Sequence, residues 1–418
     1  MFVFLSVISV LLTAAVYIRI KRIGWLMLPW FFIAWLGAEL AWFHLIWESI
    51  AIALKLGFGS LESSADKIAL AAMLVCMALQ WKIHRDGQAA GSIYAALFRQ
   101  LDIGDALSPD RPFQLLDASQ SRDWLHPFRM RRPGVEKISD VVYGDHARNR
   151  LDIYRARNAA NSPSPVLLQV HGGGWVIGDK KEQALPLMHQ LAQNGWVCVA
   201  INYRLGPQNR MPAHIEDVKK ALAWIKQHIA EYGGDPEFIA ITGGSAGGHL
   251  SSLAALTPHI KAWQPGFEEI DLAVQACVPF YGIFDFTDRH NTRGKVSMEK
   301  FLGQQVMPAP KAEAYDLWEQ LSPLSHVGPH APPMLVIHGT HDSLAFVEEA
   351  RIFVEALRTN ASNPVVYAEL PNTQHAFDIF HSPRSTHTVA AIQRFLEYCY
   401  ANYLAAVQQE VQLKASTR

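Results

Sequence analysis

Hydrophobic positions divide the chain into two unlike regions. Residues 1–84 carry very little charge and contain three apolar runs, at Phe2–Ile20, Trp25–Trp47 and Ile68–Trp81. A helix that crosses a bilayer needs about 20 mainly apolar residues, a length that the first two runs reach and the third approaches. The pattern therefore predicts that residues 1–84 form a membrane-spanning region of two to three helices.

From residue 85 onward the chain has the polarity of a soluble protein. Residues 85–135 combine short helical patterns with several prolines, and they predict a connector that forms part of a lid. Beyond it, apolar runs typical of strands alternate with stretches typical of helices, which predicts the α/β class with a mostly parallel central sheet flanked by helices. Strands are expected at Ile138–Val142, Leu151–Tyr154, Pro165–Val170, Trp196–Asn202, Phe238–Thr242, Ala273–Phe280, Met334–His338 and Val365–Leu370, and helices at Glu182–Asn194, Ile215–Glu231, Ala246–Leu256, Val347–Leu357 and Thr388–Leu404.

One stretch interrupts this alternation. Residues 284–325 are polar and helical, and Pro308 and Pro310 break their pattern. Long insertions between regular elements often serve as lids over binding sites. We therefore expect a helical lid here, within a catalytic domain that covers residues 136–408.

The overall charge excludes one class of partner. The 418 residues have a formal net charge of −1 and contain no long basic block. Since proteins that bind nucleic acids present basic surfaces, no nucleic-acid partner is expected. Cys76, Cys198, Cys277 and Cys399 are far apart and lack the spacing of metal ligands or of a disulfide framework, so we expect buried free thiols in a reducing compartment.

Basic residues near the apolar runs predict the orientation in a membrane. Lys21 and Arg22 follow the first run, and Lys82 and Arg85 follow the third. Such residues favour the cytoplasmic side. Three spans then give a multi-pass protein of a bacterial plasma membrane with a cytoplasmic catalytic domain, whereas two spans place this domain on the opposite side.

A G-x-S-x-G motif lies between a strand-like run and a helix. Its central residue is Ser245, flanked by Gly243 and Gly247. In α/β-hydrolases this motif forms a sharp strand-to-helix turn that holds a nucleophilic serine above the sheet. A side chain at either glycine would clash with the neighbouring strand or helix. Ser245 is therefore the predicted nucleophile.

A glycine-rich loop, His171–Trp175, follows another strand-like run. Consecutive glycines allow the backbone to approach a substrate carbonyl closely. We expect the backbone N–H groups of Gly172 and Gly173, together with that of Ala246, to form an oxyanion hole.

The remaining triad members are expected downstream of the serine. The chain order in α/β-hydrolases is serine, acid, histidine, and open α/β sheets gather their sites at the carboxyl ends of strands. Asp342 and His375 each follow a strand-like run. His375 is the predicted base, and Asp342 is the acid that orients it.

Other residues compete for these roles. The rival acids lie on a helix or beyond His375, and the rival bases lie close to the two predicted loops. His338, His341 and Asp342 also suggest a metal site, but they occupy a strand end and turn without a further ligand cluster, so none is predicted. The rivals are Glu348, Glu349, Asp378, His338, His341, His381 and His387.

Together these motifs resemble the hormone-sensitive-lipase family of α/β-hydrolase carboxylesterases, over residues 136 to 404. The resemblance implies an α/β-hydrolase fold, the triad Ser245, Asp342 and His375, and no cofactor. It is carried by His171–Trp175, Tyr203–Leu205, Pro212-Ala213 with Asp217, Tyr232–Pro236, Gly243–Gly248, His341-Asp342 and His375–Phe377.

Two departures from the family pattern bear on substrate preference. Gly206-Pro207-Gln208 stands where the family usually has Ala-Pro-Glu, and Asn372-Thr373-Gln374 precedes the histidine where a glycine is common. Neither departure removes a catalytic group.

The predicted function is a membrane-anchored serine carboxylesterase that hydrolyses short- to medium-chain acyl esters, including lipids, through an acyl-enzyme on Ser245. An amidase or formamidase, or a lipid acyltransferase, would use the same triad, and these alternatives stay open, as does the oligomeric state. A non-catalytic binding module is disfavoured because His375 is retained. We expect a chain without residues 1–84 to remain active on soluble esters.

Overall fold

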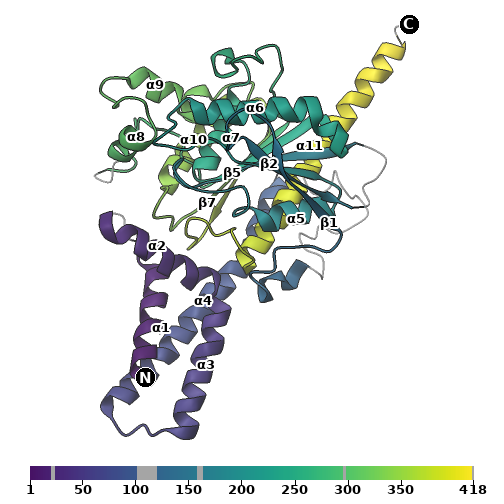
Figure 1. Cartoon of the computed structure of the whole chain (residues 1–418). Coiled ribbons are helices and arrows are strands. Elements are labelled where there is room, and N and C mark those ends of the chain that lie inside the picture. The colour runs from purple at the N-terminus through teal and green to yellow at the C-terminus, as the bar shows by residue number, and fades with distance from the viewer. Residues whose placement is uncertain (20–23, 101–119, 158–162, 295–297, 417–418) are drawn as a thin grey trace.

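A computed structural model describes residues 1–19, 24–100, 120–157, 163–294 and 298–416 of the chain. It consists of an α/β domain and an N-terminal helical bundle that projects from one end of it (Figure 1). Lys21 and Arg22, on which the expected membrane orientation depends, lie outside the described residues.

The α/β domain is built on one sheet, which has eight strands in the described part of the chain. The strand order is β1-β2-β4-β3-β5-β6-β7-β8; β1 and β2, and β2 and β4, pair antiparallel, and all other neighbours are parallel. The predicted mostly parallel sheet is confirmed. The strands are β1 (Val135–Val142), β2 (Arg150–Ala156), β3 (Ser164–Val170), β4 (Val197–Ile201), β5 (Gly234–Gly244), β6 (Ala276–Phe280), β7 (Met334–Gly339) and β8 (Val365–Leu370).

Helices cover both faces of this sheet because successive strand residues point to opposite sides. In β3, Val166, Leu168 and Val170 pack into one buried cluster with the helices on one face of the sheet, whereas Leu167 packs into another cluster with the helices on the opposite face. The helices of the domain are α5 (Leu185–Gln193), α6 (Ala213–His228), α7 (Ala246–Leu256), α10 (Val347–Asn360) and α11 (Pro383–Ser416), with short 3₁₀ helices η1 (Gln120–Leu125), η2 (Ile229–Tyr232) and η3 (Lys261–Trp263).

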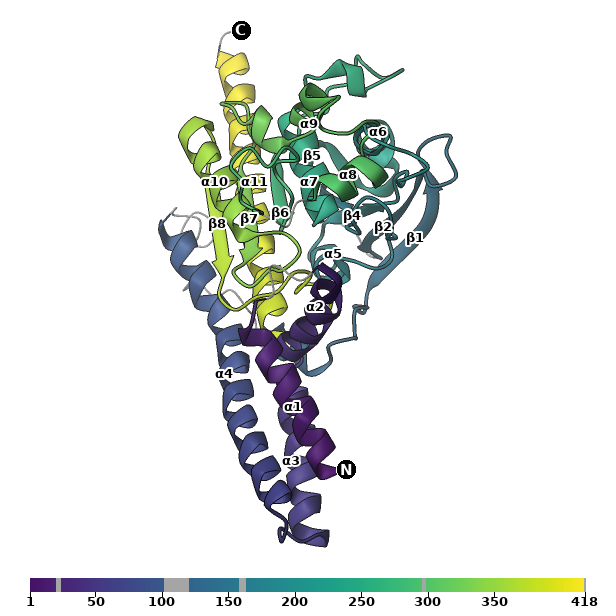
Figure 2. The ribbon, with the colours of Figure 1, turned by 90° about the vertical axis from the view of Figure 1, so that its left-hand side faces the viewer.

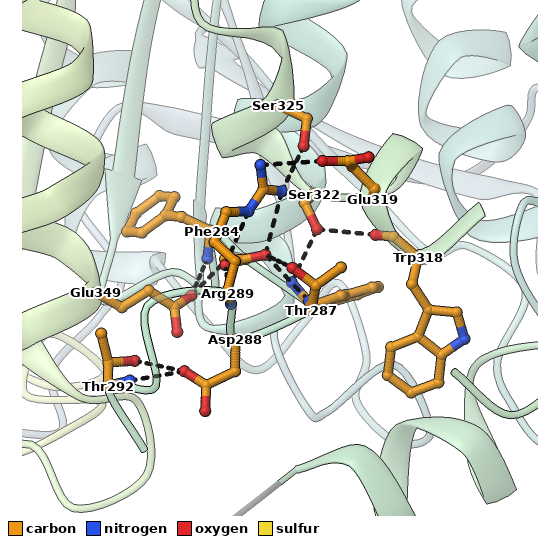
Figure 3. A network of polar contacts seen from close by, with 12 residues as sticks. Phe284, Thr287, Asp288, Arg289, Thr292, Trp318, Glu319, Ser322, Ser325 and Glu349 are labelled. Atoms are coloured by element: carbon orange, nitrogen blue, oxygen red, sulfur yellow. Dashed lines mark hydrogen bonds and ion pairs between the residues drawn. The ribbon is translucent and has the colours of Figure 1, made fainter. Parts of the chain in front are cut away.

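The predicted insertion at residues 284–325 contains α8 (Glu299–Gln305), α9 (Tyr315–Gln320) and most of η4 (Pro323–His326). A polar network holds it in place (Figure 3). Arg289 donates hydrogen bonds to Asp285 and to Ser325 Oγ, and Glu349 of α10 accepts the backbone N–H groups of Phe284 and Asp285. These contacts fasten the insertion to the α/β domain.

Four helices form the N-terminal region: α1 (Phe2–Tyr17), α2 (Gly24–Glu39), α3 (Ala41–Phe58) and α4 (Ser64–Gln100). In both ribbon views α1, α3 and α4 run side by side away from the domain, and α2 lies where the bundle meets it (Figures 1 and 2). Among the described residues, two helices, α3 and α4, are long and apolar enough to cross a membrane, and α1 is a shorter apolar helix.

The expectation that Trp25–Trp47 forms one spanning helix is wrong. The chain breaks at Leu40, between α2 and α3. The physical reason is Glu39, the one acid of this run, which forms a buried ion pair with Arg384 and accepts a hydrogen bond from Ser382 Oγ at 2.5 Å. This pairing ties the end of α2 to the α/β domain.

Helix α4 belongs to both regions of the molecule. It runs through residue 84, where the boundary between membrane region and connector was expected. Its second half packs on the sheet domain, with Tyr94 donating a hydrogen bond to Thr388 Oγ1 at 3.0 Å. Residues 101–119 of the expected connector lie outside the described residues.

Candidate active site

Ser245 occupies a strained turn between β5 and α7. Its backbone has φ +58° and ψ −119°, a region that a residue with a side chain rarely adopts and that is typical of functional sites. A Cβ atom at Gly243 would lie 2.5 Å from the Gly247 backbone, and one at Gly247 would lie 2.0 Å from Val170 O. The turn therefore requires both glycines of the motif.

The glycine-rich loop passes directly beside this turn. A Cβ atom at Gly172 would lie 3.2 Å from Ser245 Cβ. The N–H of Gly172 donates to Gln183 Oε1 at 2.7 Å, so it is already paired. Gly173 has φ +114°, and Ala246 is the first residue of α7, where backbone N–H groups have no acceptor within the helix. Of the three expected donors, Gly172 is thus engaged by a side chain that the sequence did not single out.

Three buried histidines support the loop: His171 is its first residue, and His214 and His249 contact it from α6 and α7. Trp175 Nε1 donates to His249 Nδ1 at 3.3 Å, and His214 Nε2 lies 3.2 Å from Trp175 O. Burial lowers the pKa of His171 and His214 to about 4 and that of His249 to about 3. All three are neutral at physiological pH, and they pack and hydrogen-bond the loop without adding charge.

Asp342 and His375 lie at the ends of β7 and β8 and contact each other. His375 Nδ1 is 2.7 Å from Asp342 Oδ2. Asp342 Oδ1 also accepts the N–H groups of Leu344 and Ala345, both at 2.8 Å. Burial alone would raise the pKa of Asp342, but the charge of His375 and the hydrogen bonds from His338 and His375 outweigh it and hold this pKa well below its usual value. The carboxylate of Asp342 is therefore ionised in the folded protein near neutral pH.

Gln374 joins the loops that carry the acid and the base. Its Oε1 accepts the N–H of His375 at 2.9 Å and the N–H and Oγ–H of Ser343 at 2.8 and 3.2 Å. The sequence marked Gln374 only as a departure from the family pattern. The structure places it as the bridge between the two loops.

The rival acids bind other groups. Glu348 pairs with Arg19, Glu349 with Arg293, and Asp378 accepts a hydrogen bond from Tyr281 Oη.

The rival bases are also accounted for. His338 Nε2 lies 2.8 Å from Ala345 O and 3.4 Å from Asp342 Oδ2, so it supports the acid from a second side. His341 contacts Thr340, and His387 contacts Gln88. Neither ring nitrogen of His381 is hydrogen-bonded to an acid among the described residues.

No group of three or more His, Cys, Asp or Glu side chains arranged to hold a metal ion occurs among the described residues. Asp342 is instead surrounded by N–H donors. The four cysteines are buried and free, as the sequence predicted.

The N-terminal region also reaches the site. Arg19 Nε donates to Asp342 O at 3.0 Å, and the ring of Phe31 in α2 meets the His375 ring edge-on, with centroids 6.2 Å apart. Sequence reasoning missed both residues. The available signal was Arg19 itself, a lone charge in an apolar run.

Comparison with known proteins finds relatives that are named as ester hydrolases. A family model described as BD-FAE matches residues 151–357, which include Ser245 and Asp342 but end before His375. The chain is 53% identical over 264 residues to the probable carboxylic ester hydrolase LipM of Mycobacterium tuberculosis, covering 63% of this chain and 61% of LipM. It is 37% identical over 318 residues to the esterase LipC of the same organism, covering 75% of this chain and 76% of LipC. This chain thus spans less than two thirds of the length of LipM.

Solved structures confirm the α/β-hydrolase fold. The butyrate-bound thermophilic esterase Est2 of the Planctomycetes species Thermogutta terrifontis is 26% identical with a TM-score of 0.51, covering 67% of this chain and 95% of the esterase. Esterase B of Lactobacillus rhamnosis, at 20% identity, has a TM-score of 0.57 and covers 76% of this chain and 98% of its own. The latter likeness concerns the fold alone.

Proposed function

The chain belongs to the hormone-sensitive-lipase-like family of α/β-hydrolase esterases, and from this premise we propose that it is a membrane-anchored serine carboxylesterase. Two observations carry the proposal: the 2.7 Å contact between Asp342 and His375, and the strained strand-to-helix turn that holds Ser245. A nucleophile, a base and an acid that orients the base are the requirements of acyl transfer.

In the proposed first half-reaction Ser245 Oγ attacks the ester carbonyl carbon while His375 takes its proton. The negative charge on the carbonyl oxygen is stabilised by backbone N–H groups of Gly173 and Ala246; that of Gly172 remains with Gln183. His375 then gives the proton to the leaving alcohol, and the acyl group stays on Ser245. Water, deprotonated by His375, releases the carboxylic acid and restores the serine.

Asp342 keeps the proton of His375 on Nδ1, which leaves Nε2 free to accept the proton of Ser245. Its own ionisation supports this role, because its pKa is held below the usual value. A permanently charged carboxylate stabilises the imidazolium that forms during the reaction.

Membrane anchoring is proposed from the apolar surface of the bundle. Ile50 and Leu54 of α3 and Leu74 and Val75 of α4 are more than half exposed. Residues of this kind are stable in hydrocarbon and costly in water. With α1, α3 and α4 as three crossings, a multi-pass anchor carries the catalytic domain on the cytoplasmic side of a bacterial plasma membrane.

The test uses p-nitrophenyl esters from acetate to palmitate and a fluorophosphonate probe. The wild-type chain should hydrolyse the short- and medium-chain esters and become covalently labelled, and Ser245→Ala should lose both properties. Labelling that persists in Ser245→Ala would identify another nucleophile. A wild-type chain that is labelled but hydrolyses no ester would favour an amide substrate or acyl transfer instead.

A further inference from the structure

Helix α2 buries part of its apolar surface against the α/β domain and leaves other apolar side chains exposed. Phe31 and Ala34 are 6% and 3% exposed, whereas Leu28 and Phe32 are 53% and 47% exposed. The buried face contacts the active-site side of the domain, beneath the carboxyl ends of the parallel strands (Figure 2). α2 is therefore part of the surroundings of the catalytic histidine.

Two polar ties, one between α1 and α2 and one at the last residue of α2, connect the N-terminal region to the segments that carry Asp342 and His375. Before the helix, Arg19 donates to the backbone oxygen of Asp342 and pairs with Glu348 at 3.4 Å. At its last residue, Glu39 pairs with Arg384, just after the loop of His375. An anchor alone would need neither contact, since both join the N-terminal region to the α/β domain.

Between these ties, aromatic side chains of α2 pack on the base and on one another. The Phe31 ring meets the His375 ring at 6.2 Å, stacks on the Trp35 ring at 5.9 Å, and Trp35 packs on Phe380 at 5.1 Å. The indole N–H of Trp35 is buried and has no hydrogen-bond partner among the described residues. A buried donor without an acceptor is costly, and a ligand that carries an acceptor removes this cost.

The chemistry of His375 shows which part of a substrate lies here. On the proposed function, His375 delivers its proton to the oxygen of the leaving alcohol, so this alcohol lies next to the imidazole. We infer that Phe31 and Trp35 of α2 form the binding surface for the alcohol part of the ester. The inference rests on the proposed esterase function and assigns its substrate class: esters of apolar alkyl or aromatic alcohols.

If α2 binds the alcohol part of the ester, the acylation step depends on α2 and the deacylation step does not. Acylation takes place with the alcohol still bound, whereas deacylation begins after it has left. Loss of the Phe31 ring should therefore slow acylation by esters of large apolar alcohols and leave deacylation unchanged.

The experiment compares Phe31→Ala with Leu28→Ala, which removes an apolar side chain from an exposed position one turn earlier on the same helix. The full-length chain is assayed in phospholipid vesicles with ethyl acetate, 2-naphthyl acetate and 2-naphthyl butyrate. In Phe31→Ala we expect kcat/KM for both naphthyl esters to fall about 10-fold, as for loss of a buried aromatic contact, and that for ethyl acetate to change less than 2-fold. The deacylation rate after a 2-naphthyl acetate burst should equal that of wild type, and Leu28→Ala should match wild type throughout.

Three results would overturn the inference: an equal loss on all three esters, a loss that follows the acyl chain, or no loss beyond that of Leu28→Ala. Fluorophosphonate labelling of Ser245 reports whether each variant keeps a folded site, and Phe31→Leu replaces Phe31→Ala if the latter is unlabelled. Failure of the esterase proposal gives a different result, because the wild-type chain would then hydrolyse none of the esters.

Discussion

At the scale of single residues, the amide of Gln374 is the part of the site that motif matching does not explain. Its Oε1 accepts hydrogen bonds from both catalytic loops, through Ser343 and His375. The resemblance implies a glycine in the stretch that Asn372-Thr373-Gln374 occupies here, and a glycine has no side chain that could make this bridge. The side chain of Gln374 therefore fixes the position of His375 relative to Asp342.

We expect Gln374→Met, which has a similar length but no comparable acceptor, to lower kcat about tenfold. Three buried donors lose their acceptor, and a catalytic base displaced by a fraction of an ångström loses much of its rate. The measurement is kcat for p-nitrophenyl acetate, with KM followed in parallel. An unchanged kcat would show that the two loops hold their geometry without the bridge.

At this scale, the sequence predicts the catalytic residues that belong to recognisable motifs. Ser245, Asp342 and His375 follow from their order along the chain and their places after strands, and the structure brings Asp342 and His375 into contact. Gln183 and Arg19 were missed, because each acts through a backbone group of another segment. Arg19 and Asp342 are 323 positions apart, and no local pattern records such a contact.

At the scale of elements, the strands were the most predictable part of the fold. The expected strand Val365–Leu370 coincides with β8, and the expected helix Ala246–Leu256 coincides with α7. Both are continuous apolar runs bounded by turns, so the limits of each element are clear from the sequence. The break between α2 and α3 was not predictable in the same way. It depends on the ion pair between Glu39 and Arg384, and Arg384 belongs to the α/β domain.

His249 of α7, which contacts the glycine-rich loop, predicts that the free energy of unfolding depends on pH. His249 Nδ1 accepts from Trp175, so its proton lies on Nε2, which faces Leu321 O at 2.7 Å. Burial lowers the pKa of His249 from 6.5 to about 3. The unfolded chain therefore takes up a proton below about pH 6.5 that the folded chain excludes, and stability falls as the pH falls through this window.

In His249→Gln this contribution is absent. Between pH 7 and pH 5 the wild-type chain should lose roughly 2 kcal/mol more unfolding free energy than the variant. Urea unfolding in detergent micelles at the two pH values measures the difference. Equal losses in both chains would mean that His249 is not the group that resists protonation.

At the scale of the whole molecule, the structure changes what we expect from removing the N-terminal region. From the sequence, residues 1–84 are an anchor, and a chain without them should stay active on soluble esters. In the structure, that deletion removes Arg19 from the Asp342 loop, Phe31 from His375 and Glu39 from Arg384. It also cuts α4, whose second half packs on the sheet domain.

We therefore expect the chain that lacks residues 1–84 to hydrolyse even ethyl acetate about 100-fold more slowly than the full chain, because both catalytic loops lose contacts that fix their geometry. Far-UV circular dichroism and a cooperative thermal transition establish that the shortened domain is folded. Arg19→Met in the full-length chain is the matched comparison: it removes one tie, keeps the anchor, and should show a smaller loss in the same direction. A folded truncation with the wild-type kcat on ethyl acetate would show that the ties of Arg19 and Glu39 are not needed for the chemistry at Ser245.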